Sequence, residues 1–224
     1  MNPLILALDT THEFGSIALL EGRNVVEEIL LHSPDGFGHV LFGHLARLLD
    51  RSSRRVDDVE CFAAAAGPGS FTGVRVGLAC IKGLAEATGR RVVTVSNLEA
   101  LATFGSAATR AVVLDARRGE IYAAVYDAAG QTLREPVVTA FPSWLATLPE
   151  GSVEFISTDF TPFEPALHGT RFAGSDIVTA PRALAAAIGV IACARFCAGL
   201  AQDPAEIDAD YIRRSDAELL WKDR

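Results

Sequence analysis

The amino-acid sequence predicts an α/β protein built from two similar lobes, of which the second is degraded. Short apolar runs typical of buried strands alternate along the chain with segments of helical periodicity. An apolar run that ends in an aspartate occurs twice, at Leu4–Asp9 and at Ala111–Asp115, and a similar order of elements follows each time. Such a run could recur by chance in any α/β protein, but the matching order of the later elements favours duplication. We therefore expect lobes at residues 1–105 and 106–224, joined without a long linker.

The first lobe is expected to start with a three-stranded meander and to continue with alternating helices and strands. Its expected strands are 4–8, 16–20, 25–31, 61–66 and 92–95. Leu41, Leu45 and Leu48 recur at helical spacing and predict the first helix. A second helix is expected at about 71–87, and Ser96 or Asn97 is a suitable cap for a third.

The second lobe repeats this beginning and then diverges. We expect strands at 111–115, 121–126, 137–140 and 153–156, with a short helix at 142–148. Pro181 suits the first turn of a long helix that reaches about Leu200. That helix is apolar on most sides, so it is expected to be buried.

Composition excludes several classes of protein. The chain has 224 residues, half of them hydrophobic, and can bury a real core. Its net charge of −8 argues against direct electrostatic binding of nucleic acid, and its two lysines, Lys82 and Lys222, argue against a lysine-lined phosphate groove. The longest uncharged apolar run on one helix, 183–194, is too short to span a membrane. With no basic leader and four unevenly placed cysteines, we expect a soluble, cytoplasmic protein with reduced thiols.

Two turns are candidates for binding a phosphate or a nucleotide. Asp9, Thr10 and Thr11 follow the first strand, and Asp115 and Arg117 occupy the same place in the second lobe. Turn amides and short polar side chains can bind phosphate, and one Asp from each lobe could hold a nucleotide-bound Mg²⁺. Asp and Thr also terminate strands in ordinary turns, and these residues alone favour that reading.

The most distinctive segment is glycine-rich and runs Gly67-Pro68-Gly69-Ser70-Phe71-Thr72-Gly73. No lysine follows it, so it is not a Walker loop, and its glycine spacing is not that of a dinucleotide-binding turn. Its pattern around the serine is not that of a nucleophile elbow. We expect a sharp turn that starts the second helix, with Ser70 or Thr72 near the N-cap.

The helix that follows has two stripes. Its apolar stripe consists of Phe71, Val74, Leu78, Ile81 and Ala85, and its stripe of small residues consists of Gly73, Gly77 and Cys80. Glycine inside a helix costs about 0.5–1 kcal/mol relative to alanine, so a backbone must approach closely there. Spacing alone leaves open whether that backbone belongs to the same lobe or to a partner.

The sequence contains no complete metal site and no activated nucleophile. His39 and His44 are five residues apart, which is not the spacing that points two ligands at one metal. Cys193 and Cys197 lie one turn apart on the apolar helix, where cysteine commonly acts as a small apolar residue. We therefore expect no catalytic residue and no bound metal.

Three segments together resemble the TsaB (YeaZ) family. They are 6–11 with 15–19, the glycine-rich run 67–77, and 115–122, in the family's order and spacing. Tyr211-Ile212-Arg213 resembles the family's ending. The resemblance covers about residues 4–126 and is weak beyond them.

The resemblance implies an actin-like ATPase fold of the hexokinase/Hsp70 type. It implies a non-catalytic scaffold in the complex that adds threonylcarbamoyl to the tRNA adenosine beside the anticodon. In that role the chain would bind and activate a TsaD-like paralogue, join a TsaE-like ATPase, form a homodimer when alone, and reach tRNA only through the complex. It would need no cofactor itself, with ADP or ATP and Mg²⁺ placed at the complex interface. The alternative is an active Mg-ATP-dependent ATPase or kinase that uses Asp9, Thr10 and Asp115.

The family also implies that the first two helices form the surface for dimerisation and for TsaD. The resemblance therefore favours the interpretation that the backbone approaching the small-residue stripe belongs to a partner. The implied interface consists of His39, Leu41, Phe42, Leu45, Gly73, Val74, Gly77, Cys80, Ile81 and Leu84.

Overall fold

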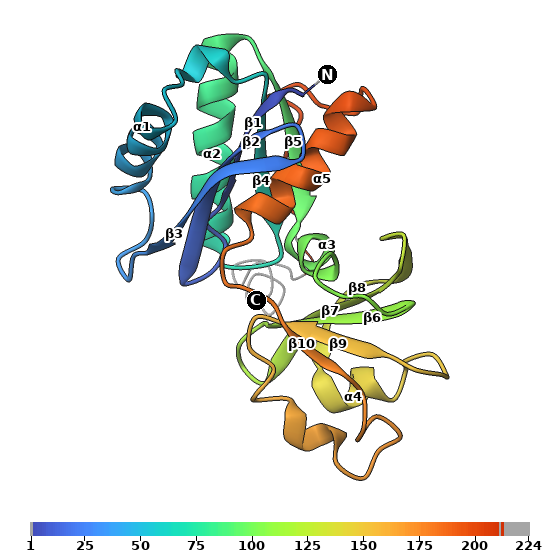
Figure 1. Ribbon diagram of the computed structural model, residues 1–224. Coiled ribbons are helices and arrows are strands. Elements are labelled where there is room, and N and C mark those ends of the chain that lie inside the picture. Colours follow the sequence, from blue (N-terminus) through green and yellow to red (C-terminus); the bar gives the residue numbers. More distant parts are fainter. Residues whose placement is uncertain (1, 211, 213–224) are drawn as a thin grey trace, which may run out of the picture. The chain divides into compact units, whose positions relative to one another are not determined.

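The computed structural model describes residues 2–210 and residue 212. The chain forms two compact units (Figure 1). Unit 1 contains the described residues up to Ala100 together with Arg182–Asp210, and unit 2 contains Leu101–Pro181. The expected division near residue 105 is therefore close at the first boundary, but wrong for 182–210, which we had placed in the second lobe. Of the segment Tyr211-Ile212-Arg213, only Ile212 lies among the described residues.

Unit 1 is built on a mixed five-stranded sheet. Its strands are β1 (Leu4–Asp9), β2 (Phe14–Glu21), β3 (Asn24–His32), β4 (Cys61–Gly67) and β5 (Arg91–Ser96), in the order β3-β2-β1-β4-β5. The meander β1–β3 is antiparallel, whereas β4 and β5 run parallel to β1. All residues of the central strands β1 and β4 are buried, which explains why they read as continuous apolar runs.

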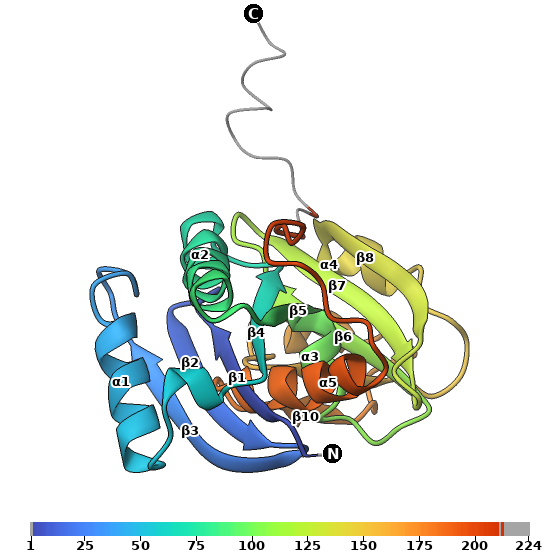
Figure 2. The same cartoon turned by 90° about the horizontal axis from the view of Figure 1, so that it is seen from above.

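Helices cover both faces of this sheet, as Figure 2 shows. Helices α1 (Leu41–Arg51) and α2 (Phe71–Thr88) share one core with the even-numbered leucines of β1. The 3-10 helix η1 (Val56–Asp58) and helix α3 (Asn97–Ala102) are short. The predicted leucine stripe of α1 is buried as expected. Within the described residues, no helix is long and apolar enough to cross a bilayer.

Helix α5 (Ala185–Cys197) covers the other face of the unit 1 sheet. It starts later than the predicted Pro181, because the backbone N–H groups of Leu184 and Ala185 donate to Ser16 Oγ at 3.0 and 2.8 Å. Gly189 lies so close to Leu20 that a Cβ there would overlap its side chain. These contacts with β2 explain why the helix belongs to unit 1. Its inner side is buried as predicted, whereas Cys197 at its end is exposed.

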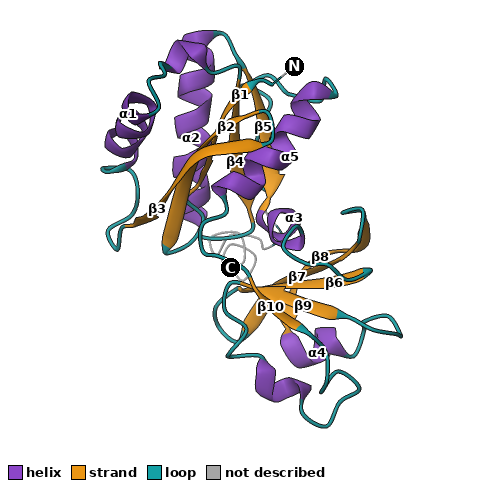
Figure 3. Cartoon of the chain, viewed as in Figure 1, coloured by secondary structure: helices purple, strands orange, loops and turns teal. Residues whose placement is uncertain are grey.

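Unit 2 repeats the topology of unit 1 (Figure 3). Its strands are β6 (Thr109–Asp115), β7 (Glu120–Asp127), β8 (Thr132–Ala140), β9 (Glu154–Ser157) and β10 (Ile177–Thr179), in the order β10-β9-β6-β7-β8. β6–β8 form an antiparallel meander, and β9 and β10 run parallel to β6. The predicted duplication is therefore confirmed.

The second copy is reduced, as the sequence predicted. Helix α4 (Phe141–Leu145) has five residues where α1 has eleven, and the 3-10 helix η2 (Glu164–Leu167) lies between β9 and β10, where unit 1 has α2. Strands β9 and β10 have four and three residues, and β10 was not predicted. Aromatic side chains fill the smaller core: Phe141, Trp144, Phe155, Phe160 and Phe172.

Candidate functional site

The glycine-rich segment packs on the turn that follows β1. Ser70 is the N-cap of α2, and its hydroxyl accepts a hydrogen bond from Gly73 N at 3.3 Å. The backbone N–H of Ser70 donates to Thr11 O at 2.6 Å. Of the two predicted caps, Ser70 is confirmed, and Thr72 lies exposed in the first turn of the helix. The motif thus joins the start of α2 to the end of β1.

Three glycines at four-residue spacing make this approach possible, and we call Gly69, Gly73 and Gly77 the glycine ridge. A Cβ on Gly69 would lie 2.5 Å from Thr11 O, and one on Gly73 would overlap Thr10 O. A Cβ on Gly77 would lie 2.6 Å from Thr10 Oγ1. The hydroxyl of Thr10 also donates to Gly73 O at 2.7 Å. The close approach is therefore made within unit 1, and the prediction that Gly73 and Gly77 admit a partner's backbone is wrong.

Other members of the predicted interface are also internal. Leu41, Leu45, Val74, Cys80 and Ile81 are buried in the core beneath α1 and α2, so they cannot form a partner surface. The apolar stripe that holds Val74 and Ile81 is the one that packs on the sheet. The remaining predicted residues reach the surface: His39 and Phe42 are exposed, and Gly73 and Leu84 are half-buried.

Asp9 lies at the centre of a buried polar network. Its Oδ1 accepts hydrogen bonds from Thr11 N at 2.8 Å and Thr11 Oγ1 at 2.7 Å, and its Oδ2 accepts one from Asn97 Nδ2 at 3.1 Å. Because the Thr11 hydroxyl gives its proton to Asp9, it acts as an acceptor for Asn97 Nδ2 at 3.0 Å and for His12 Nδ1 at 2.8 Å. Sequence reasoning considered Asn97 only as a helix cap and missed its link to β1.

This arrangement does not fit the predicted nucleotide site. Mg²⁺ needs carboxylate oxygens that face its water shell and the phosphates. Asp9 is 1 % exposed, and both of its oxygens are engaged by donors of its own unit. Thr10 is 1 % exposed, and its hydroxyl is committed to α2. The side chains of Asp9 and Thr10 therefore hold this turn to α2 and α3 instead of facing a magnesium nucleotide.

The equivalent turn of unit 2 is open to solvent. Asp115 and Arg117 are exposed, and Asp115 Oδ1 accepts a hydrogen bond from Arg117 N at 2.8 Å. Arg117 and Arg118 have φ values of 64° and 58°, in the left-handed region that residues other than glycine rarely adopt. This turn keeps its side chains outward, in contrast to the first turn.

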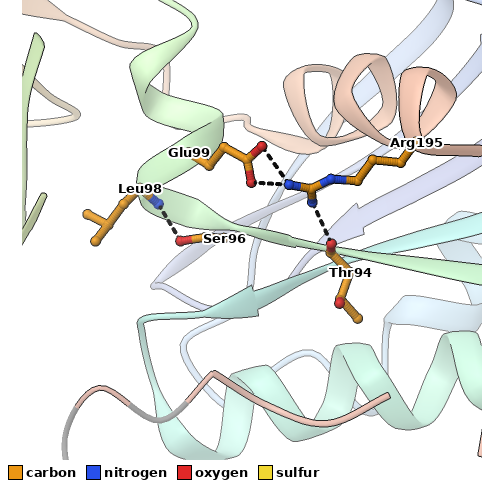
Figure 4. Close-up of polar contacts among 5 residues, drawn as sticks. All are labelled: Thr94, Ser96, Leu98, Glu99 and Arg195. Carbon is orange, nitrogen blue, oxygen red and sulfur yellow. Dashed lines mark hydrogen bonds and ion pairs between the residues drawn. The ribbon is translucent and has the colours of Figure 1, made fainter. Parts of the chain in front are cut away.

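An ion pair fixes α3, which carries Asn97, against its neighbours. Arg195 Nη2 of α5 donates to both carboxylate oxygens of Glu99, at 2.7 and 2.8 Å, and Arg195 Nη1 donates to Thr94 O at 2.9 Å (Figure 4). Ser96 Oγ accepts a hydrogen bond from Leu98 N at 3.3 Å at the start of the same helix. The short helix is thus held on the α5 side through Glu99 and on the β1 side through Asn97.

Cys61, Cys80 and Cys193 are buried and are poor candidates for nucleophiles. Burial raises the pKa of the Cys61 and Cys80 thiols to about 12, so both stay protonated at neutral pH. Burial also raises the pKa of Cys193, and neighbouring Cys197 raises it further. Among residues 2–210 and 212, no three His, Cys, Asp or Glu side chains are grouped so that they could hold a metal ion.

Helices α1 and α2 each expose a large apolar side chain in their first turn, including Phe71 of the predicted apolar stripe. Phe42 of α1 is 60 % exposed and Phe71 of α2 is 45 % exposed. The guanidinium of Arg75 lies 3.4 Å from the centre of the Phe71 ring. Because β3 and β4 are parallel, α1 and α2 both start at the same edge of the sheet, which places Phe42 and Phe71 at the same end of the layer. We call the exposed side chains of Phe42, Phe71 and Arg75 the outer face.

A strand order that occurs twice, with helices on the sheet, defines the actin-like ATPase class of folds. The sequence model of the family described as "TsaD: tRNA N6-adenosine threonylcarbamoyltransferase" matches residues 39–220. The chain belongs to this family, and within it to the TsaB (YeaZ) group.

Individual proteins support both assignments. The tRNA threonylcarbamoyladenosine biosynthesis protein TsaB of Bacillus subtilis is 28 % identical over 231 residues, which cover 97 % of each chain. The solved structure of YeaZ from Pseudomonas aeruginosa superposes with a TM-score of 0.79 at 23 % identity, covering 93 % of this chain and 99 % of that one. Component A of the (R)-2-hydroxyglutaryl-CoA dehydratase of Acidaminococcus fermentans shares the fold at a TM-score of 0.54 and 10 % identity, covering 87 % and 99 %.

Proposed function

We propose that this chain acts in the biosynthesis of threonylcarbamoyladenosine in tRNA, as a non-catalytic subunit that binds and activates a TsaD-like transferase. The assignment to this pathway is supported by relatives that are named for it, since the Bacillus subtilis TsaB aligns over nearly the whole chain. The match to the transferase family supports a paralogous pair, in which one member carries the chemistry and the other binds it.

The buried state of Asp9 is the observation that carries the non-catalytic role. A catalytic or metal-binding carboxylate must present an oxygen to its substrate or metal, and Asp9 presents none. Asp9 and Thr10, two of the three residues on which the ATPase or kinase alternative depends, are used to hold the turn. Under this proposal the chain requires no cofactor of its own, and any ADP or ATP with Mg²⁺ belongs to the assembled complex.

The outer face is the proposed docking surface. Aromatic and arginine side chains dominate the binding energy of protein interfaces, and Phe42, Phe71 and Arg75 provide both kinds. The same face would serve the homodimer when the chain is alone, and a TsaE-like ATPase would join the complex with TsaD. The net charge of −8 disfavours direct binding of tRNA, so tRNA would be reached through the partners, in the cytoplasm.

The decisive experiment compares two exposed apolar residues of unit 1. Phe42→Arg places a charge in the proposed interface, whereas Leu200→Arg, at a residue that is 64 % exposed beyond α5, serves as the control. We expect Phe42→Arg to abolish co-purification with the TsaD-like transferase and to lower tRNA modification in an assay reconstituted with each component omitted in turn. Leu200→Arg should leave both unchanged. Equal binding by the two variants would contradict the docking surface, and ATP turnover by the chain alone would contradict the non-catalytic role.

A further inference from the structure

The turn after β1 and the first half of α2 form a connected assembly that the docking role does not itself require. Thr10 Oγ1 donates to Gly73 O at 2.7 Å, and Thr11 O accepts from Ser70 N at 2.6 Å. These two bonds reach the start of α2 from the turn after β1, across the glycine ridge. No side chain separates the two backbones there, so the position of α2 depends directly on the position of the turn.

Asn97 fixes the conformation of the turn after β1. Its Nδ2 donates to Asp9 Oδ2 and to Thr11 Oγ1, so it bridges the two side chains that shape the turn. Asn97 is fully buried, and two residues further along α3 Glu99 is bound by Arg195. Because α3 is fixed by the ion pair of Glu99, the side chain of Asn97 has a fixed position, and its bond to Thr11 restricts the position of Thr11.

We propose that Thr10 and Asn97 are positioning residues for partner binding, which rests on the docking role proposed above. Together with the glycine ridge they form a clasp that holds the first half of α2 in one place. Phe71 and Arg75 project from this half, so the clasp sets where the outer face presents them. A partner binds with an affinity reduced by the fraction of chains in which α2 is out of place.

The test removes, one at a time, the hydroxyl groups of two threonines. Each hydroxyl donates a hydrogen bond of the same length to a backbone carbonyl of α2. Thr10→Val deletes the bond from the turn after β1 to Gly73 O, whereas the control Thr88→Val deletes a bond of 2.7 Å from Thr88 to Leu84 O within α2. Thr10→Ser keeps the hydroxyl and serves as the rescue. Asn97→Ala removes both bonds of the bridge and is the stronger second variant.

Two measurements separate positioning from general destabilisation. Amide hydrogen exchange is expected to rise at least fivefold at residues 73–78 in Thr10→Val and in Asn97→Ala, with residues 81–88 unchanged. The affinity for the TsaD-like transferase, measured by calorimetry, is expected to fall in proportion to the loss of chains with α2 in place, up to about tenfold, which is the upper limit for one lost hydrogen bond. Thr10→Ser and Thr88→Val should keep wild-type affinity.

Each outcome decides the proposal. Unchanged exchange at residues 73–78 in both variants would overturn the clasp, and faster exchange with unchanged affinity would overturn its positioning role. Equal loss of affinity in Thr88→Val would show that any loosening of α2 suffices and would also overturn it. If the wild-type chain does not bind the transferase, the docking role fails, and the exchange data still decide whether the clasp holds α2.

Discussion

Replacing Gly77 by alanine tests the structural account of the glycine ridge most directly. The new Cβ would lie 2.6 Å from Thr10 Oγ1 and 3.1 Å from Leu8 Cδ1, whereas ordinary contacts start at about 3.4 Å. The side chain of Leu8 can yield, but Thr10 is held by its bond to Gly73 O. Either that bond breaks or α2 moves outward by about 0.8 Å. Overpacking of this kind costs about 1–3 kcal/mol, and the better helix propensity of alanine returns about 0.5–1 kcal/mol.

The matched control lies on the same helix. Apart from its own helix backbone and chain neighbours, no atom of the described residues lies within 4 Å of a Cβ at Gly83, so Gly83→Ala gains the helix propensity without a clash. Gly77→Ala is therefore expected to lower the midpoint of thermal unfolding by about 2–6 °C and Gly83→Ala to raise it by about 1–3 °C, both followed by circular dichroism. A Gly77→Ala protein as stable as the Gly83→Ala protein would refute the claim that the ridge packs on Thr10.

Three further predictions concern other parts of the chain. Glu154 accepts hydrogen bonds from two backbone N–H groups in unit 2, so Glu154→Ala should lower the free energy of unfolding by about 2 kcal/mol or more, while Glu154→Gln should retain most of it in denaturant titrations. Arg195→Met removes the ion pair with Glu99 and should cost about 1 kcal/mol by the same measurement; no change would contradict a stabilising role for the pair. Alkylation of the folded protein at pH 8, followed by mass spectrometry, should modify exposed Cys197 and spare Cys61, whose pKa of about 12 leaves little thiolate. Modification of Cys61 before Cys197 would contradict this prediction.

The sequence predicted the strands well because most of them are continuous apolar runs. Leu4–Asp9 and Cys61–Gly67 are buried on both faces, so their composition alone identifies them. The three-residue strand Ile177–Thr179 is too short to carry a periodic signal and was missed. The helix Ala185–Cys197 was predicted as apolar, but apolarity does not say which sheet a helix covers. Its unit is decided by its contacts with β2, which are distant in sequence.

The candidate site was harder to predict because it depends on pairs of distant residues. Gly73 and Gly77 indicated that some backbone comes close, but their spacing is the same whether that backbone is Thr10 or a partner. The interface implied by the family therefore included residues that pack inward. Asn97 had no distinguishing signal, since asparagine at the start of a helix is an ordinary cap and its bond to Asp9 spans 88 positions.

The placement of α5 has a consequence for biosynthesis of the chain itself. On the ribosome, residues 101–181 emerge while one face of the sheet formed by β1–β5 still lacks the helix that covers it. The described part of unit 2 is continuous in sequence, so it can complete its core first, although it is the later segment to be translated. The nascent chain therefore carries a sheet that is uncovered on one face in unit 1 until Ala185–Cys197 has left the exit tunnel.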